Sequence, residues 1–512
     1  MTKPRRPWWK KLLLFTAFAL VAILTIVVLA LSWLSFQGRR DWAKTKADLL
    51  ARGEKLSLIE LAPAPIPDEQ NFFGDQMWKE LLDTEEIVDS NGIHSQRVRL
   101  PRGKRQIDAI NPALAPGMLQ RARTQLHLPP SWPSSVNAGI TIAISASAEL
   151  RKTDDPATQQ ELAQLILDAL APGLAARQHI ESLLDRPGAV YSTDYSRGLV
   201  TPLEHISYLL TLGQIYNATA IARLALGDTA QAAHDVSILL RLADTLNADP
   251  LFISLLVRRA LLDMGAGVIN RGIARHLWTD SQLAAFEQSL ARINLPRQLA
   301  FAFRGERGAI NQFLETLSRK GQQAKQMWRA FAGLSDSSQI PGRAAQAIYV
   351  FAAAKDQADI NRLFQKYIDA LESPDGVQPE APLDLSDKGT LYNATHFLTA
   401  TTANSTLSSI PQIIYSQDAI LQTRIACALE RYRLQHGAYP DSLDALVPAF
   451  IAGIPNDALA RQKFHYRLDA PDKFRLWSVG WNETDEGGIT ATSRGALDKD
   501  DWVWNDPPGP KR

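Results

Sequence analysis

The chain has 512 residues, a formal net charge of +1 at pH 7, and 21% charged residues. This length allows two or three domains with sizeable cores, and the balanced charge excludes a nucleic-acid partner bound by bulk electrostatic attraction. A single cysteine, Cys427, excludes an intramolecular disulfide, and its position in an apolar helical pattern predicts a buried thiol.

The N-terminal segment has the length and composition of a membrane span. After a basic lead with two tryptophans, Leu12–Phe36 contains no charged residue. As a helix this stretch is about 37 Å long, whereas the hydrocarbon core of a bilayer is about 30 Å thick. We therefore expect residues 1–36 to be a basic lead and a transmembrane anchor in contact with the lipid bilayer. A signal peptide cleaved near Ala30–Ser32 is the alternative, although its apolar region is usually shorter.

The charges beside this span do not decide its orientation. Five Lys or Arg residues precede the span and five follow it closely, so the positive-inside rule gives a tie. The residues counted are Lys3, Arg5, Arg6, Lys10 and Lys11 before the span, and Arg39, Arg40, Lys44, Lys46 and Arg52 after it.

Residues 37–70 are predicted to form a juxtamembrane helix followed by a proline-rich linker, because alternating prolines at 63, 65 and 67 prevent a helix. Within this segment Leu56–Leu61 reads LSLIEL, which resembles the opening of a prepilin. In prepilins that motif starts the apolar helix, whereas here it follows the span, so we interpret the match as chance.

Residues 71–372 are predicted to form a mainly helical domain. Val136–Ser145 has the composition of a strand, and helical periodicity strengthens from Asp155-Pro156, where Asp suits the cap and Pro the first turn. A helical hairpin is expected around Gly227-Asp228-Thr229; it resembles one tetratricopeptide unit but is not repeated at a fixed period. The helices expected in this domain include Leu203–Leu226, Thr229–Leu246, Pro250–Ile269, Ser281–Ile293, Arg297–Leu317, Gln322–Phe331 and Arg343–Glu372.

Residues 373–409 lack a period and are predicted to be a linker, and residues 410–512 are predicted to form a small α+β module. Its helix ends at His436-Gly437, where glycine can adopt a positive φ. Alternating apolar and polar residues then predict strands over Phe464–Leu468 and Phe474–Val479, followed by a Gly/Asp-rich loop. The fold class expected for the whole chain is therefore mainly α, with a transmembrane helix, a helical central domain and this small module.

The stretch HGAYPDSLDALV, the two strands and the loop GWNETDEGG together resemble the C-terminal domain of the major pseudopilin of type II secretion. The resemblance implies a small antiparallel sheet and a loop that binds calcium. By this resemblance the calcium ligands would be Asp485, Asp498, Asp500 and Asp501. The chain departs from the family pattern between Ile489 and Leu497 and lacks the D-P-W-G-x-P-Y segment, so a solvated acidic loop stays the alternative.

The same resemblance implies where the protein lies. We expect a single-pass protein of the bacterial inner membrane with an extracytoplasmic body, similar to anchored envelope proteins of the Planctomycetes–Verrucomicrobia group. The chain contains no P-loop, nucleophile elbow, HExxH motif or cysteine pair for zinc. The sequence therefore favours a non-enzymatic scaffold with protein partners, linked to a secretion-like system. An enzyme with a site assembled from scattered residues of the helical domain is the alternative.

Overall fold

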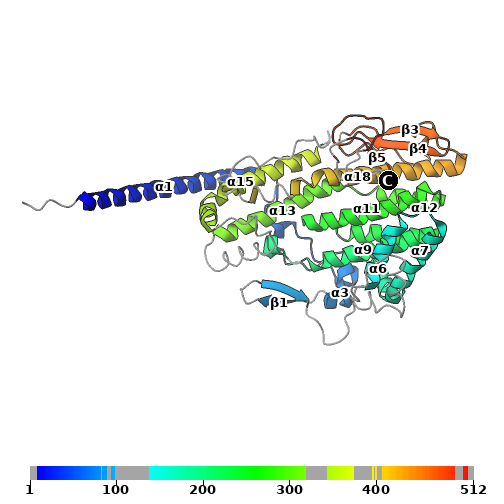
Figure 1. Ribbon diagram of the computed structural model, residues 1–512, viewed down its shortest axis with the longest axis horizontal. Coiled ribbons are helices and arrows are strands. Elements are labelled where there is room, and N and C mark those ends of the chain that lie inside the picture. Colours follow the sequence, from blue (N-terminus) through cyan, green and yellow to red (C-terminus); the bar gives the residue numbers. More distant parts are fainter. Residues whose placement is uncertain are drawn as a thin grey trace, which may run out of the picture.

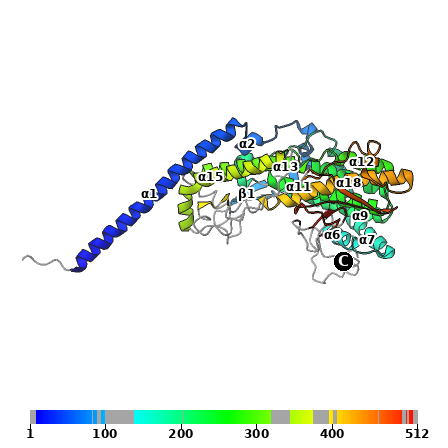
Figure 2. The same cartoon turned by 90° about the horizontal axis from the view of Figure 1, so that it is seen from above.

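One helix, α1 (Trp8–Ala51), projects from a body of packed helices, and a small sheet lies on the outer side of that body (Figures 1 and 2). The computed structural model describes residues 8–81, 84–88, 94–98, 138–201, 203–318, 343–373, 395–396, 398–399, 406–459, 461–490, 497 and 500–505. The mainly helical fold expected from the sequence is confirmed.

Helix α1 is continuous from the apolar segment into the charged residues that follow it, up to Ala51. None of its most apolar stretch is buried against the rest of the chain. The helix ends at Ala51, and a short helix α2 (Leu58–Leu61) follows. Ser57 and Glu60 form a capping box at the start of α2, and Leu58 is fully buried. The LSLIEL motif is thus a short packed helix rather than the start of a long one.

The first part of the body differs from expectation at two places. The segment that was expected to include a strand at 136–145 is instead helix α6 (Ala138–Leu150). Its apolar residues are buried against α7 (Pro156–Leu170) and α9 (Glu204–Ala225), and this packing outweighs strand propensity. A hairpin of β1 (Thr84–Val88) and β2 (His94–Val98), which the sequence did not predict, precedes it.

The local signals for helix ends are confirmed in the helical hairpin. Gly227 has a φ of +79° at the end of α9, and the Asp228 side chain accepts from the Gln231 N–H to start α10 (Thr229–Asp244). Asp155 and Thr279 also cap helices as expected. The other helices described before the tail are α3 (Gln76–Leu81), α8 (Leu174–Leu183), α11 (Phe252–Ala274), α12 (Asp280–Leu290), α13 (Leu295–Ser318) and α15 (Arg343–Glu372). The helix expected at 322–331 lies outside the described residues.

The C-terminal helix α18 (Ile410–His436) packs against α11, α12 and α13 and shares their core. One hydrophobic cluster extends from Phe72 to Trp502 and includes the fully buried Cys427. The helix ends at Gly437, whose φ is +82°. The antiparallel sheet that follows has the order β3-β4-β5 and lies beside α18 (Figure 1). Its strands are β3 (His465–Ala470), β4 (Lys473–Ser478) and β5 (Trp502–Val503).

Short 3-10 turns connect several of these elements. They are η1 (Asp68–Gln70), η2 (Phe72–Gly74), η3 (Ala171–Gly173), η4 (Tyr195–Val200) and η7 (Leu443–Leu446).

Candidate functional site

The C-terminal part of α1 is joined to the body along α15. Three pairs of residues, each with the same sequence offset, show that α1 and α15 run parallel, and successive pairs lie one heptad apart as in a coiled coil. The pairs are Gly38 with Lys355, Thr45 with Arg362, and Arg52 with Asp369. A Cβ atom on Gly38 would lie 2.8 Å from the Lys355 backbone nitrogen, so glycine permits the close approach.

A network of buried charges holds the chain just after α1. The carboxylate of Glu54 accepts hydrogen bonds from Arg304 at 2.9 Å and from Arg307 at 2.5 Å, and the Arg307 side chain is fully buried. Gln365 contacts both Glu54 and Arg307. Burial alone would raise the pKa of Glu54, but the two guanidinium groups outweigh it and lower the pKa to about 2. The carboxylate is therefore ionised and bound on both sides at neutral pH.

The acidic loop of the tail module is the site that the sequence predicted. Asp501 is fully buried, and its carboxylate accepts from the N–H groups of Glu486, Gly488 and Ile489 at 3.4, 2.7 and 3.1 Å. Burial raises the pKa of Asp501, and these hydrogen bonds offset only part of the effect. The Asp501 side chain therefore fixes the conformation of the loop by binding backbone N–H groups of the loop. The position of Asp501 in the sequence did not predict this role.

Two other predicted ligands, Asp485 and Asp500, lie at different places around this loop. Asp485 accepts from the indole N–H of Trp477 at 3.0 Å and from the Gly487 N–H at 2.9 Å, and these bonds lower its pKa. Asp500 has a φ of +62° and pairs with Thr490 in an isolated bridge. The fourth residue, at 498, lies outside the described residues.

In addition to burial, the carboxylates of this loop raise the pKa of Glu486 and of Asp501. Burial raises the pKa of Glu486, and Asp501 and Asp500 raise it further. One Glu486 oxygen accepts from Asn482 at 2.8 Å, and the other is buried without a hydrogen-bond partner among the described residues. Across the described part of the chain, no three His, Cys, Asp or Glu side chains are arranged to hold a metal ion. Calcium binding here stays a prediction.

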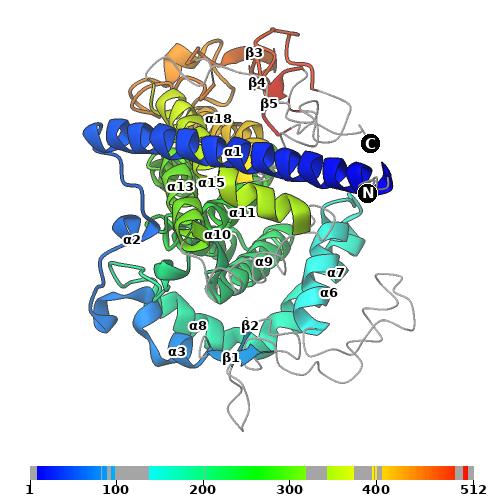
Figure 3. The same cartoon turned by 90° about the vertical axis from the view of Figure 1, so that its left-hand side faces the viewer.

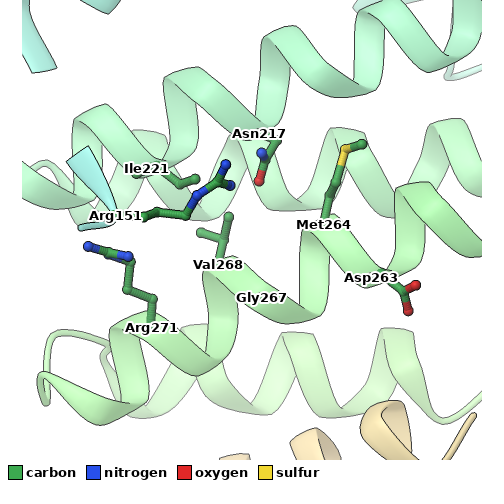
Figure 4. Close-up of a pocket in the computed structure, with 8 residues that line it drawn as sticks. All are labelled: Arg151, Asn217, Ile221, Asp263, Met264, Gly267, Val268 and Arg271. Atoms are coloured by element: carbon green, nitrogen blue, oxygen red, sulfur yellow. The ribbon is translucent and has the colours of Figure 1, made fainter. Parts of the chain in front are cut away.

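A recess of about 300 Å³ opens between α6, α9 and α11 (Figure 4). Asp263 is exposed at this recess, and its carboxylate accepts a hydrogen bond from Ser416 Oγ at 3.1 Å. In Figure 4 the Asp263 carboxylate points away from Arg151 and Arg271, so the recess does not place an acid and a base within hydrogen-bond reach. The lining residues are Arg151, Asn217, Ile221, Asp263, Met264, Gly267, Val268 and Arg271.

A second buried network joins the body to the tail. The fully buried carboxylate of Glu430 accepts from Tyr439 Oη at 2.6 Å and from Arg433 Nε at 2.9 Å, and it lies 3.0 Å from His276 Nδ1. Burial would raise the pKa of Glu430, but the hydrogen bonds from these three partners lower it. The i, i+3 spacing of Glu430 and Arg433 was the local signal for this network, and its other members come from distant segments.

A buried carboxylate also ties α18 to the segment before the sheet. Asp418 is fully buried, and its carboxylate accepts from the Ala458 N–H at 2.6 Å. Burial and the neighbouring Asp457 carboxylate raise the pKa of Asp418. No motif or spacing in the sequence marked Asp418, which lies directly after the buried polar residues Ser416 and Gln417 of α18.

Comparison with protein-family models, with curated proteins and with solved structures finds no match to this chain.

Proposed function

We propose that this chain is a single-pass, membrane-anchored scaffold or interaction protein of the bacterial cell envelope, with its helical body on the extracytoplasmic side of the inner membrane. The observation that carries the proposal is the division of α1 into two parts. Its apolar first part is uncovered, and its last part is packed against α15. A helix with this division suits an anchor that continues directly into a folded body.

The connection between anchor and body supports a scaffolding role. A flexible linker would let the body move freely over the membrane, whereas the α1–α15 contact and the Glu54 network hold it against the anchor. A body held in one orientation presents the same surface to every partner, which lowers the entropic cost of binding. The proposed partners are other envelope proteins.

The proposed link to a secretion-like system rests on the tail. A long helix ending at a left-handed glycine, followed by a small antiparallel sheet and an acidic loop, is the order of elements that the pseudopilin resemblance implies. Calcium in the loop is part of this proposal and has its own test below.

Membrane fractionation tests the anchor. Full-length protein is expected to stay in the membrane pellet after carbonate washing, with the mass of the uncleaved chain by mass spectrometry. Release into the soluble fraction with a mass shortened near Ser32 would establish a cleaved signal peptide and contradict the anchor.

Reporter fusions test the orientation. A reporter that is active only in the periplasm, fused after the last residue, is expected to be active, and a cytoplasmic reporter at the same place inactive. The reverse pattern would place the body in the cytoplasm.

Cross-linking in intact membranes tests the scaffolding role. Purification of the cross-linked protein in a neutral detergent would identify its partners, and a set of partners without envelope proteins would contradict the scaffold.

A further inference from the structure

The outward side of α15 changes character at Lys355. Between 349 and 355 the exposed side chains are those of Val350 and Phe351, which are 45% and 38% exposed. Between 356 and 372 every exposed side chain is charged. These charged residues are Arg362, Lys366, Asp369 and Glu372. An exposed helix face normally carries polar residues, so the apolar pair needs an explanation.

Helix α1 changes in the same way at Gly38. Trp33 and Phe36, which precede it, are 61% and 59% exposed. Arg39 and Arg40, which follow it, are the first charged residues after the span, and both are exposed. Aromatic residues followed by arginines are typical of the boundary between a bilayer and water.

The two changes occur at the same level, because Gly38 lies directly against Lys355. Since α1 and α15 run parallel, the part of α15 that precedes Lys355 lies at the membrane end of their contact. Figures 2 and 3 show α15 beside α1 at the end of the body from which α1 projects. Tyr349 and Ala352 are fully buried, so they occupy the inner side of α15 and Val350 and Phe351 the outer side.

We propose that the start of α15 is a second membrane contact, in which Val350 and Phe351 insert into the boundary between headgroups and acyl chains beside the α1 span. The proposal rests on α1 being the membrane anchor. A helix that lies at this boundary buries apolar and aromatic side chains there and keeps charged residues in water, which is the distribution of the exposed side chains of α15 from Val350 to Glu372. The body would then touch the bilayer at two places, which restricts its tilt relative to α1.

Site-directed spin labelling can test this contact in the full chain, because the lone Cys427 is fully buried and should stay unlabelled. The variants Val350→Cys and Phe351→Cys would carry a nitroxide in phosphatidylcholine vesicles. Collisions with oxygen, which concentrates in lipid, would be compared with collisions with a water-soluble nickel chelate. Leu434→Cys is the matched control, because Leu434 is 44% exposed at the far end of α18. Leu24→Cys reports on the span itself.

Labels at 350 and 351 are expected to collide more with oxygen than with the nickel chelate, as the label at 24 should, and the label at 434 is expected to show the reverse. If the label at 24 is in lipid while those at 350 and 351 behave like that at 434, the second contact is wrong and the anchor stands. If the label at 24 is also in water, both the anchor and the second contact are wrong.

Discussion

The buried guanidinium of Arg307 lies 2.5 Å from the carboxylate of Glu54, which is 253 residues earlier in the chain. Glu54 follows α1, and Arg307 lies in the middle of α13. This ion pair therefore joins the segment after α1 to the core of the body. Because Arg307 is fully buried, its charge depends on Glu54 for compensation.

Replacing Glu54 is expected to weaken the whole body. Glu54→Gln would leave Arg307 buried without its carboxylate, and breaking a buried pair in this way costs about 3–5 kcal/mol. Chemical denaturation of the full-length protein in a neutral detergent would measure the loss. Glu161→Gln, at an exposed position of α7, is the control and should change stability by less than about 0.5 kcal/mol. Equal stability of the two variants would show that the network contributes nothing.

The same carboxylate predicts a loss of stability in acid. The pKa of Glu54 falls from its ordinary 4.5 to about 2 in the folded protein, so its contribution is present above pH 4.5 and lost as the pH falls toward 2. The stability difference between wild type and Glu54→Gln should therefore shrink across this window. A difference that stays constant from pH 5 to pH 3 would contradict the lowered pKa.

The contribution of Glu306 to stability is expected to depend on pH in the opposite direction. Burial raises its pKa from 4.5 to about 7, and the backbone N–H of Phe252 only partly opposes the shift. The folded state therefore holds this proton more tightly than the unfolded state, and the stability from Glu306 is lost as the pH rises from 4.5 through 7. Glu306→Gln should be more stable than wild type at pH 8, with the gain disappearing toward pH 5. Denaturation midpoints measured at pH 5, 6, 7 and 8 would check this, and a gain independent of pH would contradict it.

Two helical glycines are expected to respond in opposite directions to alanine. A Cβ atom on Gly267, in the recess, would meet nothing within 4 Å, so Gly267→Ala should stabilise α11 by about 0.5–1 kcal/mol. A Cβ atom on Gly305 would lie 1.9 Å from the carbonyl oxygen of Pro250, so Gly305→Ala should destabilise the protein by about 1–3 kcal/mol. Thermal unfolding of both variants beside wild type would measure the shifts. Stabilisation by both would show that the contact at Pro250 relaxes freely.

Calcium in the acidic loop is tested by the melting temperature of the full-length protein. The full chain is required because α18 is buried in the body, so the tail cannot be separated from its core. Millimolar calcium is expected to raise the melting temperature, since a ligand at a hundred times its Kd adds about 2.7 kcal/mol, and magnesium should do less.

Two variants distinguish stabilisation by bound calcium from stabilisation by the hydrogen bonds within the loop. Asp500→Asn should remove the calcium effect and leave the melting temperature in chelator unchanged. Asp501→Asn should lower the melting temperature even in chelator, because Asp501 accepts three backbone N–H groups. If calcium leaves wild-type melting unchanged, the loop is a solvated acidic loop.

The sequence by itself determined the features that depend on neighbouring residues. The length of the apolar segment predicted α1, and side-chain caps at Asp155 and Thr279 marked helix starts because a cap and its N–H partner are only a few residues apart. The alternation of apolar and polar residues around Phe474 predicted the paired strands β3 and β4, because a period of two residues is also a relationship between near neighbours in the chain. At the predicted calcium site, the sequence placed Asp485, Asp500 and Asp501 near one loop.

Only the tertiary structure decided what these elements contact. The composition of residues 136–145 predicted a strand, whereas the structure has helix α6 from Ala138 onward. Burial against α7 and α9 outweighs the local strand propensity. The parallel pairing of α1 with α15, the ion pair of Glu54 with Arg307, and the position of α18 inside the body all join residues far apart in the chain. Such contacts depend on the three-dimensional path of the chain. Periodicity and capping signals describe one segment at a time, so they could not predict which distant segment would be its partner.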